Sequence, residues 1–347
     1  MAITETAENV RPASLRVAVV GAGRMGSDHV TRLAHRIHRA EVSAVVDVDR
    51  ARASAVAAEA GVPNVFESFD ELLASGTADA VLLATPGFLH EEPLLKLIEA
   101  GVPVLCEKPL TMDPEASLRV VQAEAAAGKQ LIQVGFMRRF DAGYRQLRSA
   151  IESGECGQLL TLHHQHRNPA GPPGFTDEMI INDSVVHEFD AIRFFTGEEI
   201  SNVQVRTGRV SSHAPEGVHD PQKVTAQTES GLLADVEIFV NARLGYQVHT
   251  QATFETGVVK IGENSELELT TAGRSGTSVD AGFETRFGAA YDEEVQRWVD
   301  AVRRGEIDGP SAWDGYAAGA CCAAGVASQE SGQIVNVELA PKPEFYN

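Results

Sequence analysis

The sequence predicts an α/β protein, in which a doubly wound parallel sheet is followed by an α+β region with a large, mainly antiparallel open sheet. Over residues 15–134, short apolar runs alternate with helical patterns, which is typical of a parallel sheet with right-handed crossovers. After residue 135, β-rich segments follow one another without intervening helices, as in antiparallel sheets. The chain of 347 residues is long enough for two separate cores.

The first strand is expected at residues 15–20 (LRVAVV), an apolar run that ends in glycines and suits a buried parallel strand. Further strands of this region are expected at 42–46, 65–66, 80–84, 102–106 and 131–134, with helices between them at 24–37, 51–60, 70–74, 89–100 and 114–127. The second region is expected to contain strands at 159–166, 203–210, 224–228, 232–240, 246–255 and 257–261, with helices at 140–152, 291–304 and 313–331.

These patterns divide the chain into three parts. Residues 1–14 are polar and without periodicity, and we expect a mobile extension there. Residues 15–136 form the expected dinucleotide-binding domain, and residues 137–347 the expected substrate-binding and oligomerisation domain. The Pro/Gly-rich stretch 168–174 (NPAGPPG) is expected to be a loop at the rim of a site.

Composition excludes several classes of function. Lys and Arg number 29 against 49 Asp and Glu, giving a net charge of −20, which repels nucleic acids and anionic membranes. No run of about 18 apolar residues occurs, and the N-terminus lacks the apolar core of a signal peptide. The four cysteines form no CxxC pair, which fits a reducing compartment. A soluble, cytoplasmic protein is therefore expected.

A glycine motif lies between the first strand and the first helix: Gly21, Gly23 and Gly26 in the pattern GxGxxG, with Asp47 21 residues beyond the last glycine. This strand–turn–helix context with a downstream acid is the Rossmann fingerprint. The glycines allow a tight turn, approach of a pyrophosphate and close helix packing, and the helix end holds the phosphates. The alternative interpretation is a structural turn beside a surface aspartate.

The acid selects the cofactor. Asp47 is expected to accept hydrogen bonds from the ribose 2′-hydroxyl and to repel a 2′-phosphate, so NAD is preferred and NADP is less favoured. Arg50 and Arg52 follow closely, and an arginine in this region can accommodate the extra phosphate.

Lys108 ends the fifth expected strand, at the sheet edge where open α/β sheets bind ligands. Pro109 restricts its backbone away from the helical region. The ammonium group is therefore placed to polarise a substrate oxygen. The alternative is a Lys-Pro pair that merely ends a strand.

Asp183 and His187 are spaced i, i+4, which places them on one helix face. The pair suits a histidine base with a carboxylate that orients it. Alternatively, Asp183 is a helix N-cap and His187 a core residue.

Three histidines, His163, His164 and His166, lie on an expected strand, so His164 and His166 share one face. Nothing in the pattern makes these residues converge with Asp183 and His187 as metal ligands, and we expect no metal. One or two of the histidines are expected to donate hydrogen bonds to a polar substrate.

With these residues placed, the chain resembles the Gfo/Idh/MocA oxidoreductase family, and within it the inositol dehydrogenases, from residue 15 to the end. The motifs that carry the resemblance are GAGRMG at 21–26, ATP at 84–86, His90, CEKPL at 106–110, GFMRRFD at 135–141, HRNP at 166–169, DSVVHE at 183–188, WDGY at 313–316 and PEFY at 343–346.

The resemblance implies oxidation of a cyclitol ring hydroxyl to an inosose, with hydride passing to NAD. His187 would take the hydroxyl proton, Asp183 would support it, and Lys108 would stabilise the oxyanion. The residues implied to contact the cofactor are Gly21, Gly23, Arg24, Met25, Gly26, Asp47, Thr85, Pro86, His90, Glu107 and Lys108. The residues implied to line the substrate pocket, besides the three catalytic ones, are Met137, Arg138, His166, Asn168 and Tyr246. A homotetramer through the C-terminal sheet is also implied.

Several alternatives remain. Asn182, Ser184 and residues 175–178 (FTDE) depart from the pattern of the inositol dehydrogenases, which leaves the preferred stereoisomer open. A pyranose dehydrogenase or reductase of the same family is the nearest rival. An NAD-dependent glycosidase and a non-enzymatic NAD sensor are less favoured, since a sensor typically loses the lysine or histidine of the site.

Overall fold

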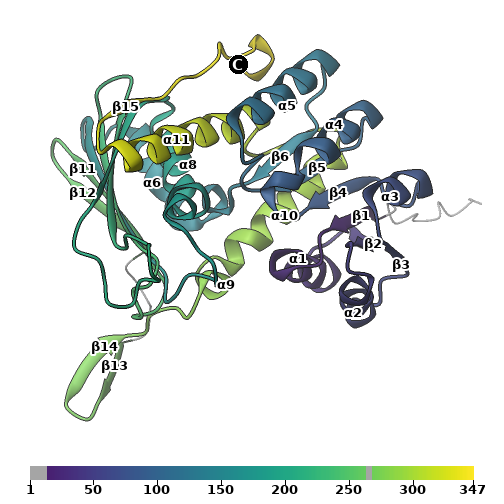
Figure 1. Cartoon of the computed structure of the whole chain (residues 1–347), viewed down its shortest axis with the longest axis horizontal. Coiled ribbons are helices and arrows are strands. Elements are labelled where there is room, and N and C mark those ends of the chain that lie inside the picture. The colour runs from purple at the N-terminus through teal and green to yellow at the C-terminus, as the bar shows by residue number, and fades with distance from the viewer. Residues whose placement is uncertain (1–13, 263–267) are drawn as a thin grey trace, which may run out of the picture.

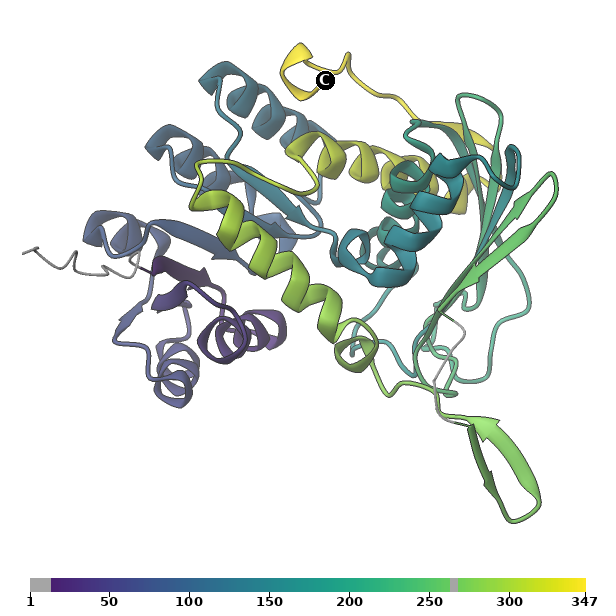
Figure 2. The same ribbon diagram turned by 180° about the vertical axis from the view of Figure 1, so that it is seen from behind.

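The computed structural model describes residues 14–262 and 268–347. Apart from Ser14, the extension expected at residues 1–14 lies outside the described residues. Two sheets with their helices lie side by side, and the long helix α10 (Gly288–Val302) runs across the first of them (Figures 1 and 2). The predicted α/β class is confirmed.

The first sheet is parallel and has six strands in the order β3-β2-β1-β4-β5-β6. Its strands are β1 (Leu15–Val20), β2 (Ala40–Val46), β3 (Asn64–Phe66), β4 (Ala80–Leu83), β5 (Val104–Glu107) and β6 (Ile132–Gly135). The helices between them are α1 (Arg24–His35), α2 (Arg50–Ala60), α3 (Phe69–Ser75), α4 (Glu91–Ala100) and α5 (Pro114–Ala127). This strand order is that of the Rossmann fold.

Alternating side chains of β1 build a core on each face of this sheet. Val17 and Val19 pack with α1, α2 and the Trp298 face of α10, whereas Ala18 and Val20 pack with α3, α4 and α5. A strand buried on both faces requires a continuous apolar run, which LRVAVV supplies. Helix α10 belongs to this layer although it follows the second sheet in the sequence.

The second sheet has the order β12-β11-β7-β10-β9-β8-β15, and its pairs are antiparallel except β7 with β10. The strands are β7 (Leu159–Arg167), β8 (Ile200–Thr207), β9 (Gln222–Thr228), β10 (Leu233–Phe239), β11 (Gln247–Phe254), β12 (Val258–Ile261) and β15 (Val335–Asn336). Helices α6 (Ala142–Ser153), α8 (Val186–Thr196) and α11 (Ala312–Ser331) lie on one face, and no helix of the described residues covers the opposite face (Figures 1 and 2).

Several features differ from the expected elements. Helix α8 lies between β7 and β8, where only strands were expected to follow one another. Strand β8 begins and ends three residues before the expected range 203–210. A hairpin of β13 (Glu268–Thr271) and β14 (Arg274–Thr277), which was not among the expected elements, projects from the body (Figure 2). A π-helical turn, Ile180–Val185, precedes α8 and contains Asp183. Such turns are often found at functional sites.

Candidate active site

The predicted cofactor residues meet at one edge of the first sheet. Gly21 follows β1, Asp47 follows β2, Thr85 follows β4 after one residue, and Lys108 follows β5. Since all six strands are parallel, these positions lie at their carboxyl ends, where α/β sheets bind ligands. The glycine turn and Lys108 therefore lie at a common edge of the sheet, as the order of the strands led us to expect.

Two of the three glycines of the turn have a steric reason, and the third lies beside open space. Gly21 has φ +97°, and a Cβ there would lie 2.6 Å from the Ala84 carbonyl oxygen. A Cβ on Gly26 would lie 1.7 Å from the oxygen of Gly21, whereas Gly23 has no atom near its Cβ position. Gly23 also begins α1 without a side-chain cap. The turn therefore packs tightly inside and leaves its outer backbone open, as an approaching pyrophosphate requires.

Asp47 is held by four hydrogen bonds. Its Oδ2 accepts from the Ala22 amide at 2.8 Å, and its Oδ1 accepts from the Asp49 amide at 2.9 Å. Arg52 donates through Nη2 at 2.6 Å and through Nε at 3.1 Å. Burial alone would raise the pKa of Asp47, but Arg52 and the two amides outweigh it and lower the pKa. The residue is thus an ionised acceptor, which fits a ribose hydroxyl and disfavours a 2′-phosphate.

Asp47→Ala should weaken NAD binding at least ~10-fold, because hydrogen bonds to a charged group contribute about 1.5–3 kcal/mol. It should also reduce the preference for NAD over NADP, since the negative charge is removed and Arg52 is left without that partner. Dissociation constants for both cofactors check this without turnover. An unchanged preference would mean that another residue reads the ribose.

Of the other predicted cofactor residues, Arg24, Met25, Glu107 and Lys108 line one cavity of about 590 Å³. Glu107 is fixed there by a 2.7 Å contact between its Oε1 and Nε2 of the buried His29. Thr85 and Pro86 form the loop after β4, against which the glycine turn packs.

His90 does not fit its predicted cofactor contact. The side chain is fully buried, with Nε2 2.8 Å from the Thr85 oxygen and Nδ1 2.9 Å from the Pro109 oxygen. Burial lowers its pKa. No exposed atom of the ring is available to a nucleotide, so His90 instead joins the loops that follow β4 and β5.

The same cavity brings together the three predicted catalytic residues, Lys108, Asp183 and His187. Lys108 Nζ donates to Asp183 Oδ1 at 2.6 Å and to the Asp183 backbone oxygen at 2.9 Å. Lys108 thereby lowers the pKa of Asp183, in spite of burial. This pairing differs from the expected one: no hydrogen bond joins Asp183 to His187, although both residues are described.

His187 is 7 % exposed, and its ring packs edge-on against Phe136 at 6.3 Å between centroids. Nδ1 is buried without a hydrogen-bond partner among the described residues. Burial above all, and then the charges of Arg138 and Lys108, hold its pKa well below the ordinary value. The imidazole is therefore neutral near pH 7 and able to accept a proton.

Of the predicted substrate residues, Met137, His166, Asn168 and Tyr246 line the cavity. Arg138 does not: it is 1 % exposed and donates through Nη1 to the buried Glu188. Arg138 therefore does not have the direct substrate contact that was predicted for it. It lies behind His166 instead, with its Nη2 3.3 Å from His166 Nδ1.

The cavity has further walls. Residues 168–173 form one wall, as expected for the Pro/Gly loop, and Phe283 and Tyr291 form another. Arg24 pairs with Glu284 and lies 4.7 Å over the Phe283 ring. Sequence reasoning missed this second wall, because its residues lie more than 250 positions after the glycine turn and carry no motif.

Within residues 14–262 and 268–347, no group of three or more His, Cys, Asp and Glu is placed to hold a metal ion. His164 and His166 share one face of β7, as expected, and this face is buried, whereas His163 faces outward, 2.7 Å from Asp235. In the same described ranges, no helix has the length and apolar character needed to cross a bilayer.

Fold and site together define a nucleotide-dependent oxidoreductase, and comparisons with known proteins agree. A family model described as "Oxidoreductase family, NAD-binding Rossmann fold" matches residues 15–136, and the Gfo/Idh/MocA C-terminal domain matches residues 144–260. The chain belongs to the Gfo/Idh/MocA family of NAD-binding oxidoreductases.

The named relatives below are all inositol dehydrogenases. The chain is 63% identical to an inositol 2-dehydrogenase of Pseudarthrobacter chlorophenolicus, over 96% of this chain and 99% of the relative. It is 46% identical to an inositol 2-dehydrogenase of Corynebacterium glutamicum, over 96% and 99%. A crystal structure of myo-inositol dehydrogenase from Lactobacillus casei, in complex with NAD(H) and myo-inositol, has TM-score 0.93 and 35% identity, covering 96% of this chain and all of that one.

Proposed function

We propose that this protein catalyses the NAD-dependent oxidation of one ring hydroxyl of an inositol, giving the inosose. The observation that carries the proposal is the single cavity in which Lys108, Asp183 and His187 face residues of the glycine turn. The names of the most similar relatives support the substrate class.

The reaction converts a CH–OH group to C=O, releasing one proton and one hydride. Bound NAD supplies the acceptor for the hydride. His187 takes the hydroxyl proton, which its lowered pKa allows at neutral pH. Lys108 stabilises the negative charge that develops on the substrate oxygen, and Asp183 holds the Lys108 ammonium in place.

A neutral polyol offers no charge for recognition, so its selection depends on directed hydrogen bonds. His166, Asn168 and Tyr246 supply such groups in the cavity, and Met137 supplies apolar surface. In this proposal, residues 15–136 bind the nucleotide and residues 137–347 provide the substrate groups and the assembly surface.

We also propose a homotetramer formed through the outer face of the second sheet. Within the part of the chain that the structure describes, no helix covers this face (Figure 2). Its side chains are held by cross-strand pairs such as Arg167 with Glu237. The mass in solution tests the assembly.

The four thiols are free, which supports a reducing compartment such as the cytoplasm.

The decisive experiment is a steady-state screen of inositol stereoisomers and aldoses with NAD and NADP, followed by NADH absorbance. We expect turnover of at least one inositol with NAD. Rates confined to aldoses would instead establish the pyranose dehydrogenase, the nearest alternative. Product release without net NADH would indicate the glycosidase, and cofactor binding without any turnover would indicate a sensor.

A further inference from the structure

Glu188 is a fully buried carboxylate directly behind the substrate cavity. It lies on α8 beside His187, and Arg138 from the turn after β6 donates to its Oε1. His166 Nδ1 lies 3.1 Å from Glu188 Oε1 and 3.2 Å from Oε2. All three side chains are at most 3 % exposed. Of the three, only His166 reaches the cavity.

The charge on Glu188 is fixed by these neighbours. Burial alone would raise its pKa, but Arg138 and His166 outweigh this effect and lower the pKa to about 2. An ionised carboxylate can only accept hydrogen bonds. Nδ1 of His166 must therefore carry a hydrogen, since both Glu188 oxygens face it. In the other tautomer, Nδ1 would carry a lone pair. This lone pair could accept from Arg138, which is only a donor, but it would also face the lone pairs of Glu188.

The other ring nitrogen faces the site. His166 Nε2 lies 3.1 Å from the side-chain oxygen Oδ1 of Asn168, at the mouth of the Pro/Gly loop. A ring that carries its hydrogen at Nδ1 alone presents a lone pair at Nε2. Turning over the Asn168 amide, whose oxygen and nitrogen can exchange places, lets its NH2 group donate to Nε2 until a substrate hydroxyl takes that position. Tyr246 packs edge-on against the ring at 5.9 Å and limits its rotation.

We propose that Glu188 is a positioning residue of the substrate site: with Arg138 it holds His166 in the Nδ1–H tautomer, so that Nε2 accepts a hydrogen bond from a substrate hydroxyl. The proposal rests on the proposed function, and it changes the role expected for His166 from donor to acceptor. Glu188 itself touches neither substrate nor reacting atoms.

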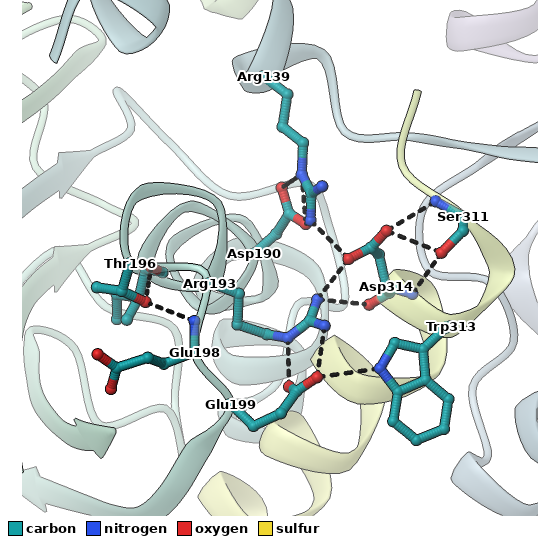
Figure 3. Close-up of polar contacts among 10 residues, drawn as sticks. Arg139, Asp190, Arg193, Thr196, Glu198, Glu199, Ser311, Trp313 and Asp314 are labelled. Atoms are coloured by element: carbon teal, nitrogen blue, oxygen red, sulfur yellow. Dashed lines mark hydrogen bonds and ion pairs between the residues drawn. The ribbon is translucent and has the colours of Figure 1, made fainter. Parts of the chain in front are cut away.

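Another arginine–carboxylate network on the same helix serves as an internal comparison. Asp190 accepts from Arg139 at 2.6 Å, Arg139 also reaches Asp314, and Arg193 connects Asp314 to Glu199 (Figure 3). Asp190 is 1 % exposed, like Glu188. None of these side chains lines the cavity of about 590 Å³. Asp190→Asn therefore disturbs a buried ion pair of α8 without touching His166.

Glu188→Gln removes the charge and keeps the shape. Its amide places an NH2 group where one of the two carboxylate oxygens stood, and an NH2 group turned to His166 favours the Nε2–H tautomer. We expect KM for the substrate to rise about 10- to 100-fold, with a smaller change in kcat, because a lost buried hydrogen bond contributes about 1–3 kcal/mol. Asp190→Asn should leave KM near that of the wild type.

Two measurements separate positioning from general loosening. In a His166→Ala background, Glu188→Gln should raise KM little further, because its effect passes through the ring. Nitrogen-15 NMR of His166 in the wild type should show Nδ1–H and an unprotonated Nε2, whether or not any inositol is oxidised. This measurement does not depend on the proposed function. It is made on the wild-type protein, so it does not depend on the folding of any variant.

The proposal would be overturned by an Nε2–H or doubly protonated ring in the wild type at assay pH. Equal rises in KM for Glu188→Gln and Asp190→Asn would overturn it too, as would an undiminished effect in the His166→Ala background. If Glu188→Gln does not fold, Glu188→Asp keeps the charge on a shorter side chain, and we expect it to retain the Nδ1–H tautomer.

Discussion

His187→Ala is expected to lower kcat at least ~100-fold, which is the lower end for loss of a general base. NAD should still bind, because the glycine turn and Asp47 lie on other elements. Single-turnover rates and NAD dissociation constants measure the two effects separately. Exposed His35, at the end of α1, provides a matched control, since His35→Ala removes an imidazole away from the cavity.

The pH profile gives the same residue a second test. His187 must be neutral to accept a proton, and burial with nearby positive charge holds its pKa well below the ordinary value of 6.5. Activity should therefore persist as pH falls through 6.5 and decline only at lower pH, where the imidazole becomes protonated. Near-normal turnover of His187→Ala, or an acid limb above pH 6.5 assigned to His187, would remove it from this role.

The nucleotide half of the site was predictable because its information is local. A tight turn, an adjacent helix and an acid at the end of the next strand all belong to one βαβ unit. Within this unit, Gly26 is required by its contact with the Gly21 oxygen, whereas Gly21 is required by the Ala84 carbonyl after β4. Even there, Arg52 was identified only as a neighbour of the ribose site. Its bidentate contact with Asp47 depends on the first turn of α2.

For the substrate half of the site, the sequence indicated which residues lie around the cavity but not which of them pair with one another. The i, i+4 spacing of Asp183 and His187 suggested a mutual contact, yet Asp183 lies in a π-helical turn and pairs with Lys108 from 75 residues earlier. Spacing on an ideal helix does not describe such a turn. Glu188 belongs to the motif DSVVHE, but the sequence predicted no role for it, because its partners Arg138 and His166 come from two other elements.

Lys108→Met is expected to lower kcat about 10²–10³-fold, the usual result of removing one donor from a developing oxyanion. Methionine keeps much of the side-chain volume and removes the charge. Lys129→Met, at an exposed position just beyond α5, is the matched control.

The pairing of Lys108 with Asp183 adds a readout that turnover alone does not give. Lys108 is the first cause of the lowered pKa of Asp183, so Lys108→Met should raise that pKa toward or above its ordinary value, which carbon-13 NMR of the Asp183 carboxyl group measures. If kcat falls while the Asp183 pKa stays low, the ammonium acts on the substrate without controlling the carboxylate. If neither changes, Lys108 has no part in the chemistry. A fall in kcat together with a raised pKa is the expected result, because one ammonium group then both stabilises the substrate oxygen and keeps Asp183 ionised beside it.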